Sequence, residues 1–313
     1  MKISIITPSY NQAGHLCETL NSVLGQGIKD LEYIVIDGGS KDGSKEIIEG
    51  FSDRLAYWCS EADAGQYQAI NKGFSKSTGE IMGWLNSSDL YMPWTLKTVE
   101  QIFTQFPEIQ WITSLQKVCI TEEGVFDGLD ETHGFSGYRL ARGLHGSATN
   151  SNFIQQETCF WRRSLWEKIG GEITDQYRFA ADFWLWSEFF KYSRCTGVEV
   201  PLAAFRFHGD QRSGEDRYRK EVVEVIARLC EGDSRQELVT GTQNIVRHWT
   251  PSSSGIGGIA SWKLISYYDD HFLGILEFWG KIAKRGKWVA SSVTYLPIAI
   301  WKFIRRGFRR VKY

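Results

Sequence analysis

Four short apolar runs in the first ninety residues each end in a polar or glycine-rich segment, and helical patterns separate them. The runs cover Ile3–Thr7, Tyr33–Ile36, Leu55–Cys59 and Ile81–Leu85. Between the first two, Leu16, Leu20, Val23 and Leu24 recur at the spacing of one helix face. Further helical patterns lie near Lys45–Phe51, at Ala69–Phe74 and after Pro93. This alternation predicts an α/β fold, a Rossmann-like and mostly parallel sheet with flanking helices.

The segments that follow these runs carry the polar residues of this region. Open parallel sheets bind ligands beyond the carboxyl ends of their strands. Backbone amides and glycine allow a diphosphate to approach closely there, and carboxylates can hold ribose or a divalent metal. The sequence contains neither GxGxxG nor a P-loop signature, which argues against hydride transfer and P-loop chemistry. The segments are Pro8–Asn11, Asp37–Ser40, Ser60–Gln66 and Asn86–Asp89.

The remaining chain is less regular up to residue 208. An aromatic helix is predicted at Asp182–Tyr192, and two more helices are predicted at Glu215–Cys230 and Ser234–Trp249. Pro251–Gly258 has the composition of a linker.

Charge is distributed unevenly over the 313 residues, although the net charge is only −1. Residues 281–313 hold ten Lys and Arg and no acid, so the first 280 residues hold 26 basic against 37 acidic side chains. Within this tail, Trp288–Trp301 has no charged residue but is too short for a membrane span. Aromatic residues framed by Lys and Arg predict contact with lipid headgroups; a helical pair packed on the domain is the alternative. Nucleic acid is not an expected partner.

The cell compartment is predicted from the cysteines and the first residues. Six scattered cysteines without a CxxC pair indicate reduced thiols, and Met1–Tyr10 has the pattern of a strand, not of a signal peptide. The expected location is cytoplasmic, peripheral on the inner face of the cell membrane.

Four motifs follow one another in a specific order: Ile5–Asn11, Ile34–Ser44, Gly65–Gly73 and Thr78–Asp89. With a fifth segment at Glu157–Gly171, they resemble family 2 glycosyltransferases of GT-A fold, of the kind found in bacterial polysaccharide assembly. The resemblance covers about Lys2–Ser213. It implies a metal-dependent, inverting enzyme of the hexosyltransferase type, with a nucleotide-sugar donor and Mn²⁺ or Mg²⁺. The expected domains are a GT-A domain (1–213), a helical extension (214–250) and a linker with the membrane-associating tail (251–313).

The resemblance implies a nucleotide-binding set at the predicted strand ends. Gln68 and Ser88 stand where members often carry Asp, which predicts weaker metal binding or an altered donor preference. Gly38 also replaces an Asp found in many members, which affects the expected contact with the base. The expected nucleotide-binding residues are Pro8, Ser9, Tyr10, Asn11, Asp37, Gln66, Lys72, Asn86 and Ser88.

Metal-binding residues are implied in two places. Asp89 matches the carboxylate that reaches the metal, and His208 matches a late histidine that approaches the metal or diphosphate. Each has a structural alternative, because Asp89 could cap a helix and a lone histidine is often structural.

The base and the acceptor side come from the second half of the resemblance. Asp182 matches the general base, which a sugar hydroxyl needs because it is a poor nucleophile at neutral pH. Its alternative role is a first-turn acid stabilised by the helix dipole. The residues expected to contact acceptor or diphosphate are Glu157, Trp161, Arg206 and Arg212.

These features together predict transfer of a sugar from a nucleotide diphosphate, UDP being the expected nucleotide, to a glycan or polyprenyl-diphosphate-linked acceptor. The alternative is a glycosyltransferase-like subunit that binds nucleotide or glycan but turns over poorly. A nucleotidyltransferase ranks below both, because the first loop lacks the Gly-rich, basic character that a triphosphate requires.

Overall fold

The computed structural model describes residues 1–132, 134–141, 153–209, 216–230, 243–249 and 261–267. All of them belong to one compact unit, Met1–Asp270. The linker, the basic tail and Arg212 of the sequence analysis lie outside the described residues.

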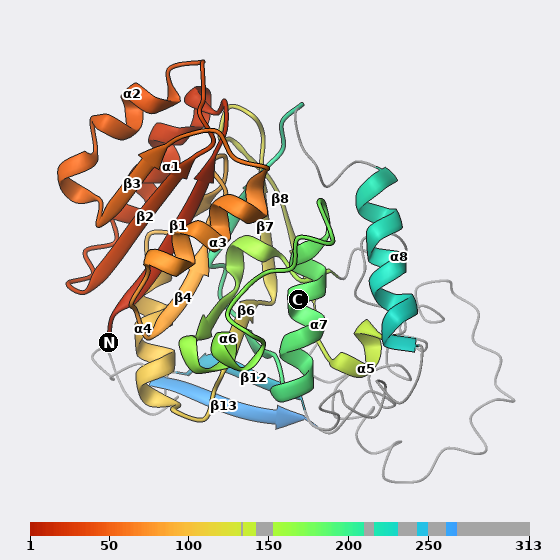
Figure 1. Cartoon of the computed structure of the whole chain (residues 1–313). Coiled ribbons are helices and arrows are strands. Elements are labelled where there is room, and N and C mark those ends of the chain that lie inside the picture. Colours follow the sequence, from red (N-terminus) through yellow and green to blue (C-terminus); the bar gives the residue numbers. More distant parts are fainter. Residues whose placement is uncertain (133, 142–152, 210–215, 231–242, 250–260, 268–313) are drawn as a thin grey trace, which may run out of the picture. The chain divides into compact units, whose positions relative to one another are not determined.

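A nine-stranded sheet forms the centre of this unit (Figure 1). Five of its eight neighbouring strand pairs run parallel, and β9 and β13 account for the three antiparallel pairs. The mostly parallel sheet predicted from the sequence is therefore confirmed. In spatial order the strands are β13 (Ser261–Tyr267), β12 (Gln243–Trp249), β10 (Thr196–Val198), β6 (Trp111–Ser114), β9 (Phe160–Arg162), β4 (Ile81–Trp84), β1 (Ile3–Ser9), β2 (Leu31–Asp37) and β3 (Tyr57–Ser60).

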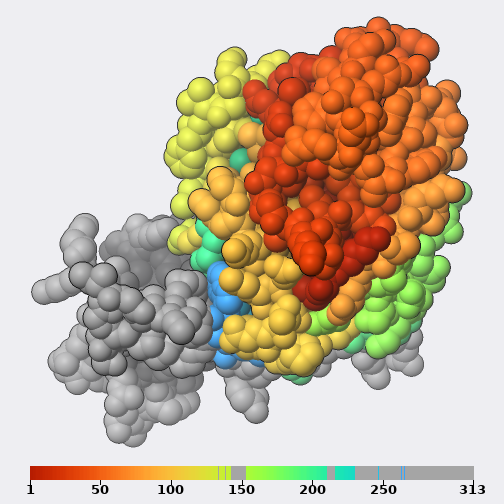
Figure 2. Space-filling model, turned by 90° about the vertical axis from the view of Figure 1, so that its left-hand side faces the viewer, coloured from red at the N-terminus to blue at the C-terminus, as the bar shows by residue number. Residues whose placement is uncertain are grey.

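Helices cover both faces of the sheet. Alternate side chains of β1 enter different cores: Ile6 packs with α3, α6, α7 and α8, whereas Ile3 and Ile5 pack with α1, α2 and α4. This two-sided burial explains the continuous apolar runs. The N-terminal segments, red to orange, cover much of the face in Figure 2. The helices are α1 (Ala13–Leu24), α2 (Ser44–Glu49), α3 (Gln66–Lys76), α4 (Thr95–Gln105), α5 (Gly137–Leu140), α6 (Arg163–Lys168), α7 (Ala181–Tyr192) and α8 (Asp216–Cys230), with short 3₁₀ turns at Ser52–Arg54 and Gln156–Thr158.

A second, four-stranded sheet joins distant parts of the chain. Its order is β5 (Leu90–Tyr91), β11 (Ala203–Arg206), β7 (Gln116–Ile120) and β8 (Phe126–Glu131). Because β11 pairs with β5, the chain around Arg206 lies next to the segment that follows β4.

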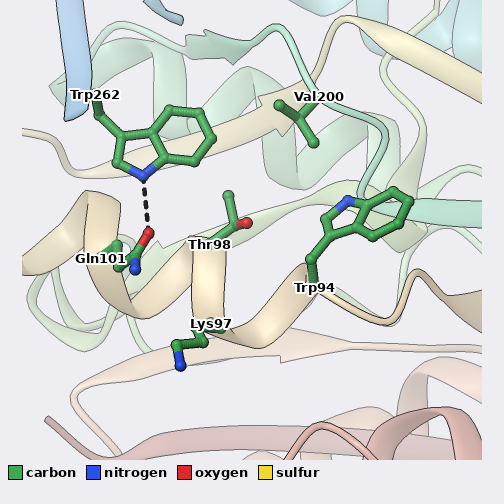
Figure 3. A pocket seen from close by; sticks show the side chains of 6 residues that line it. All are labelled: Trp94, Lys97, Thr98, Gln101, Val200 and Trp262. Carbon is green, nitrogen blue, oxygen red and sulfur yellow. Dashed lines mark hydrogen bonds between the residues drawn. The ribbon is translucent and has the colours of Figure 1, made fainter. Parts of the chain in front are cut away.

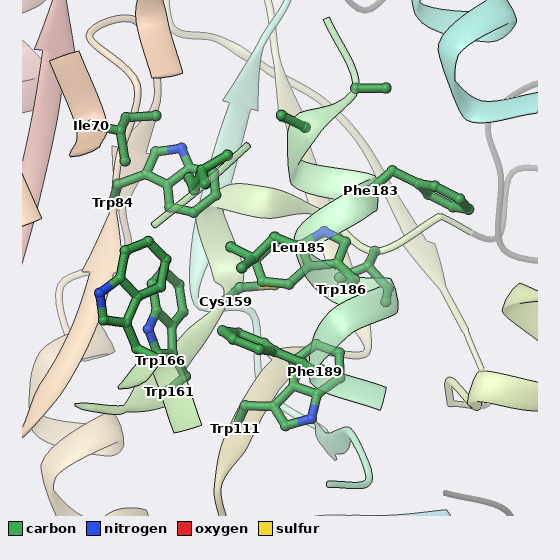
Figure 4. Close-up of a cluster of buried hydrophobic side chains, with 14 of the residues drawn as sticks. Ile70, Trp84, Trp111, Cys159, Trp161, Trp166, Phe183, Leu185, Trp186 and Phe189 are labelled. Atoms are coloured by element: carbon green, nitrogen blue, oxygen red, sulfur yellow. The ribbon is translucent and has the colours of Figure 1, made fainter. Parts of the chain in front are cut away.

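Tryptophans dominate the core between the large sheet and α7 (Figure 4). Trp186 of α7 stacks on Trp84 of β4, with ring centroids 5.9 Å apart, and on Trp111 of β6 at 5.6 Å. Trp161 packs edge-on against Trp84 and Trp186. This cluster ties the helix that carries Asp182 to the strand that leads into Asn86.

The predicted elements of the first 105 residues, the aromatic helix and the helix at 215–230 are all present, with ends within three residues of those predicted. The helix predicted at Ser234–Trp249 is wrong over 243–249, which form β12. Here β12 pairs with β10 and β13, and sheet pairing outweighs the weak helical pattern. Among the described residues, none of the helices combines the length and apolar character that crossing a bilayer requires.

Candidate active site

Asp37, at the end of β2, organises the loop that follows. The side chain is fully buried, and its carboxylate accepts hydrogen bonds from the backbone N–H groups of Gly39 and Ser40, at 3.1 and 2.9 Å. The hydroxyls of Ser40 and Ser60 donate to it at 2.5 and 2.6 Å. These hydrogen bonds fix the conformation of the Asp37–Ser40 loop and tie it to Ser60 at the end of β3.

The β1 end lies against the same loop. The backbone N–H of Gly38 donates to the carbonyl of Ser9 at 2.8 Å, and the N–H of Asn11 donates to the Ser40 hydroxyl at 2.8 Å. Asn11 has a φ of 50°, which asparagine tolerates better than most residues. Tyr10 is 60% exposed beside these buried groups. The predicted residues Pro8–Asn11 and Asp37 thus meet at one edge, with an aromatic side chain facing outward.

Asp63 lies beside the predicted nucleotide-binding residues, although the sequence analysis did not name it. Its carboxylate lies against Gly38: a Cβ placed on Gly38 would be 3.0 Å from Asp63 Oδ2. The backbone N–H of Gly65 fixes the other oxygen at 2.9 Å. Gly38 is where the resemblance expects an acid, so the loop before α3 places a carboxylate beside this position. The only available signal was Asp63's place between β3 and α3.

A second cluster forms after β4. Gln66 Nε2 donates to Asn86 Oδ1 at 2.6 Å, so the start of α3 meets the Asn86–Asp89 segment. The Ser88 hydroxyl lies 3.2 Å from His208 Nε2, and the His208 ring lies 5.6 Å from that of His15. The predicted residues Gln66, Asn86, Ser88 and His208 are therefore neighbours.

Arg206 holds this cluster together from within. The side chain is 1% exposed, and its guanidinium donates to the carbonyls of Ser88 and Glu122 and to the carboxylate of Glu18. Its backbone N–H donates to Asp89 Oδ1 at 3.0 Å. In this structure Arg206 therefore braces the Ser88–Asp89 segment, and its guanidinium faces protein acceptors, not the diphosphate contact expected from sequence.

Asp89 and Glu157 form a buried pair of acids. Both side chains are almost fully buried, at 1% and 2% exposure. Desolvation raises the pKa of Asp89 to about 7, against the hydrogen bond from Arg206. Desolvation, followed by the charge of Asp89, raises the pKa of Glu157 well above its usual value. Glu157 Oε1 has no hydrogen-bond partner among the described groups.

A divalent cation suits this donor set. An orphaned carboxylate oxygen and two crowded acids are the environment that a cation would stabilise. Within the described part of the chain there is no group of three His, Cys, Asp or Glu that could hold a metal ion. The ligands expected from the sequence, Asp89 and His208, would need phosphate and water oxygens to complete a coordination shell, as Mg²⁺ commonly does.

Asp182 lies in the first turn of α7 and is only partly exposed. Desolvation raises its pKa to about 6, although the backbone N–H of Phe183 donates to Oδ1 at 2.7 Å. The Tyr67 hydroxyl accepts from the Asp182 N–H at 3.3 Å and donates to the Phe179 carbonyl at 2.9 Å. A carboxylate with a pKa near 6 can accept a proton at neutral pH.

Trp161 lies away from these clusters, whereas Lys72 is paired with an acid whose backbone N–H donates to the Asp37 carbonyl. Trp161 is fully buried on β9 within the tryptophan core, which places it among protein side chains and not on an acceptor surface. Lys72 forms an ion pair with Glu61 at the surface of α3.

A cavity of about 320 Å³ opens on the α4 side of the unit (Figure 3). It contains none of the predicted site residues. Its lining comprises Trp94, Lys97, Thr98, Gln101, Val200 and Trp262.

Residues 4–115 match the family described as glycosyl transferase family 2. The match spans about the first third of the chain, and over this segment the chain is similar to that family. An uncharacterized glycosyltransferase of Mycobacterium tuberculosis strain H37Rv is 31% identical over 184 residues, which is 58% of this chain and 65% of that protein. One from Nostoc sp. strain PCC 7120 is 35% identical over 106 residues, 33% of each chain. The chain thus spans between a third and two thirds of the length of these curated relatives.

Solved structures extend the likeness beyond the family match. S. aureus TarS 1–349 in complex with UDP-GlcNAc superposes with a TM-score of 0.60 at 16% identity, covering 76% of this chain and 69% of that one. The mannosyltransferase PcManGT from Pyrobaculum calidifontis, in complex with GDP-Man and Mn²⁺, gives 0.56 at 18% identity, covering 75% and 66%. At these identities the likeness shows the fold, that of GT-A glycosyltransferases.

Proposed function

We propose that the protein transfers a sugar, with inversion, from a nucleotide-diphosphate donor to a hydroxyl of a glycan or lipid-linked acceptor. The observation that supports the proposal most is the environment of Asp182, a partly exposed carboxylate with a pKa of about 6 at the start of α7. Helix α7 packs on β4, the strand that precedes the Asn86–Asp89 segment. The family match of residues 4–115 and the GT-A fold support the same chemistry.

Asp182 is the general base in this mechanism. As the acceptor oxygen forms a bond to the anomeric carbon, the carboxylate takes the proton of that hydroxyl. The bond between the anomeric carbon and the diphosphate oxygen breaks, and the nucleoside diphosphate leaves with the electron pair. Attack on the face opposite the leaving group inverts the anomeric configuration.

Asp89 and His208 would hold a divalent metal, Mn²⁺ or Mg²⁺, together with the donor phosphates. When bound, the metal neutralises charge on the leaving diphosphate. Arg206 keeps the Asp89 segment in place through its backbone and guanidinium contacts. The PcManGT complex with Mn²⁺ supports the use of a divalent metal.

The β1 and β2 ends would bind the nucleoside, with Tyr10 as an exposed face for the base and Asp63 beside Gly38. The UDP-GlcNAc bound by TarS and the GDP-Man bound by PcManGT define the donor classes to test, UDP-sugars first. The acceptor is proposed to be a growing surface polysaccharide or a polyprenyl-diphosphate-linked glycan, reached from the cytoplasmic face of the membrane through the basic aromatic tail.

The test is nucleotide release from a panel of NDP-sugars with Mn²⁺ or Mg²⁺, with and without lipid-linked acceptors. One donor should support metal-dependent turnover. The Asp182→Asn variant should lose about 10²- to 10⁴-fold in kcat and keep donor binding. Asp175→Asn, an exposed acid before the same helix, is the matched control and should retain activity.

Tight nucleotide binding without turnover of any donor would instead identify a binding subunit. Ser88→Asp separates the two cases further. An enzyme that functions with serine at position 88 should gain little from the added carboxylate, whereas an impaired one should gain much.

A further inference from the structure

The segment before α7 is held by a helix that lies far along the chain. The Glu221 carboxylate of α8 accepts hydrogen bonds from three consecutive backbone N–H groups: those of Arg178 at 3.1 Å, Phe179 at 2.7 Å and Ala180 at 2.8 Å. These three residues directly precede the helix that begins at Ala181.

This contact caps a helix that has no cap of its own. Ala180 occupies the N-cap position of α7, and its methyl side chain cannot accept a hydrogen bond. The N–H groups at a helix start need outside acceptors, and a negative charge there is favoured by the helix dipole. Glu221, 41 residues further along the chain, accepts from the N–H of the N-cap residue Ala180 and places a negative charge beside the helix start.

Two further contacts from α8 fix the same segment. The Arg217 guanidinium lies over the Phe179 ring, 5.8 Å from its centroid. Arg228 lies 5.5 Å from the centroid of Tyr177 and donates to the side-chain oxygen of Gln176. Residues 176–180 are thus gripped along their length by one face of α8.

Helix α3 also forms hydrogen bonds to the chain that precedes α7. The Tyr67 hydroxyl donates to the Phe179 carbonyl at 2.9 Å. Asn71 exchanges two hydrogen bonds with the backbone of Ile173, at 2.8 and 2.9 Å. The position of Asp182 relative to the donor side therefore depends on α3 and α8 together.

We propose that Glu221 is a positioning residue for glycosyl transfer, which sets where the Asp182 carboxylate stands by capping the start of α7. The inference rests on the proposed function of Asp182. It also gives α8 a role, although this helix lies beyond the family match at 4–115 and beyond the GT-A domain expected to end at residue 213.

Electrostatics provides a readout that a purely structural role would not move. Desolvation is the main cause of the raised pKa of Asp182, and the negative charge of Glu221 raises that pKa further. Loss of that charge should shift the acidic limb of the kcat profile to lower pH. The titratable and charged groups that interact with Asp182 from neighbouring elements are Tyr67 on α3, Glu157 and Cys159 near β9, and Tyr218 and Glu221 on α8.

The experiment compares Glu221→Gln with Glu224→Gln in the full chain. Both remove one negative charge from α8, but Glu224 is exposed and touches none of residues 178–180 in the described contacts. Glu221→Gln should lower kcat about 10- to 100-fold, because a small misplacement of a catalytic group is costly. The donor KM should stay within about twofold and the acidic limb should move down in pH. Glu224→Gln should match the wild type.

Glu221→Asp, which keeps the charge on a shorter side chain, should return the acidic limb towards its wild-type pH. Equal kcat and pH profiles for Glu221→Gln and Glu224→Gln would overturn the proposal. So would a loss of kcat that merely follows the unfolded fraction measured by circular dichroism.

Amide hydrogen exchange separates this proposal from the proposed function. If the wild type turns over no donor, the role of Asp182 fails, but the cap is still testable. Exchange at residues 178–184 should be faster in Glu221→Gln than in Glu224→Gln. Unchanged exchange would show that Glu221 does not hold the segment.

Discussion

The donor edge, formed by the ends of β1 and β2, and the start of α7 are both polar sites built on a buried framework, but they are stabilised differently. At the donor edge, Asp37 is bonded to residues two and three positions away and to the neighbouring strand end. The start of α7 is instead held by hydrogen bonds to side chains of other helices. Tyr67 of α3 lies over 100 residues before it in the chain, and Glu221 of α8 lies about 40 residues after it. The first site is assembled locally and the second by tertiary contacts.

The difference teaches where each site should be vulnerable. Local hydrogen bonds at the donor edge depend on the β1–β2 pairing, which is among the most buried parts of the sheet. The base depends on helices that must dock correctly. Damage to docking should therefore affect chemistry before it affects nucleotide binding.

The largest expected effect is that of pH on the base. Asp182 accepts a proton only when ionised, and its pKa is raised to about 6. We expect kcat to be constant above this value and to fall about tenfold per pH unit below it, measured between pH 4.5 and 8. A fall in kcat that begins only near pH 4 would contradict the raised pKa of Asp182.

His208→Gln is the control for this profile, because histidines also titrate near neutrality. The limb should persist in that variant at reduced rate. Its disappearance would assign the titration to His208.

Replacing Trp161 tests whether the tryptophan core is structural. Removal of this fully buried indole by Trp161→Ala should cost about 3–5 kcal/mol in the free energy of unfolding, measured by urea denaturation. Tyr192→Ala, at a half-exposed ring on α7, is the comparison and should cost far less. A raised acceptor KM with unchanged stability would restore Trp161 to the acceptor site.

Gly73 tests the close packing of α3 on β1. An alanine Cβ there would lie 2.4 Å from Cγ2 of Ile6. Although alanine favours helices, Gly73→Ala should destabilise by about 1–3 kcal/mol through overpacking. Thermal unfolding of the variant measures this, and an unchanged or raised Tm would mean that α3 can move away from β1.

Glu32 lies near the start of β2, at the opposite end of this strand from Asp37. Burial favours the neutral form, but hydrogen bonds from Lys2, Ser4 and Thr78 outweigh it and lower the pKa to about 2. A depressed pKa stabilises the fold above the unfolded value of about 4.3, and that stability is lost as pH falls towards 2. Glu32→Gln should cost about 1–3 kcal/mol at pH 7 and progressively less towards pH 2, by urea denaturation at several pH values. An equal cost at all pH values would contradict the charge contribution.

The smallest expected effect is a gain at Gly14 of α1. No atom lies within 4 Å of a Cβ placed there, so Gly14→Ala should stabilise by about 0.4–1 kcal/mol. It is the matched control for Gly73→Ala, and a loss of stability would show that α1 is strained.

The sequence predicted the local site well and the tertiary one poorly, for a physical reason. Residues such as Asp37 and Asn86 follow apolar runs directly, so chain order alone placed them at one sheet edge. The sequence pattern does not single out Glu221, because an acid on an amphipathic helix is usually a solvent-exposed side chain. Trp161 was expected at an acceptor surface, yet β9 is an inner strand covered on both faces, so its indole is buried in the core. Over 243–249, pairing with β10 and β13 decided the structure against a helical pattern.

The stacked indoles of Trp84, Trp186 and Trp111 have an optical consequence (Figure 4). Their rings lie nearly parallel, with interplanar angles of 8° and 13°. Electronic transitions of chromophores this close couple to one another, so the folded protein should show an exciton signal in its circular dichroism spectrum. Trp84 belongs to β4, the strand that leads into Asn86, and Trp186 belongs to the helix of the base. Loss of this signal would therefore report that α7 has separated from β4.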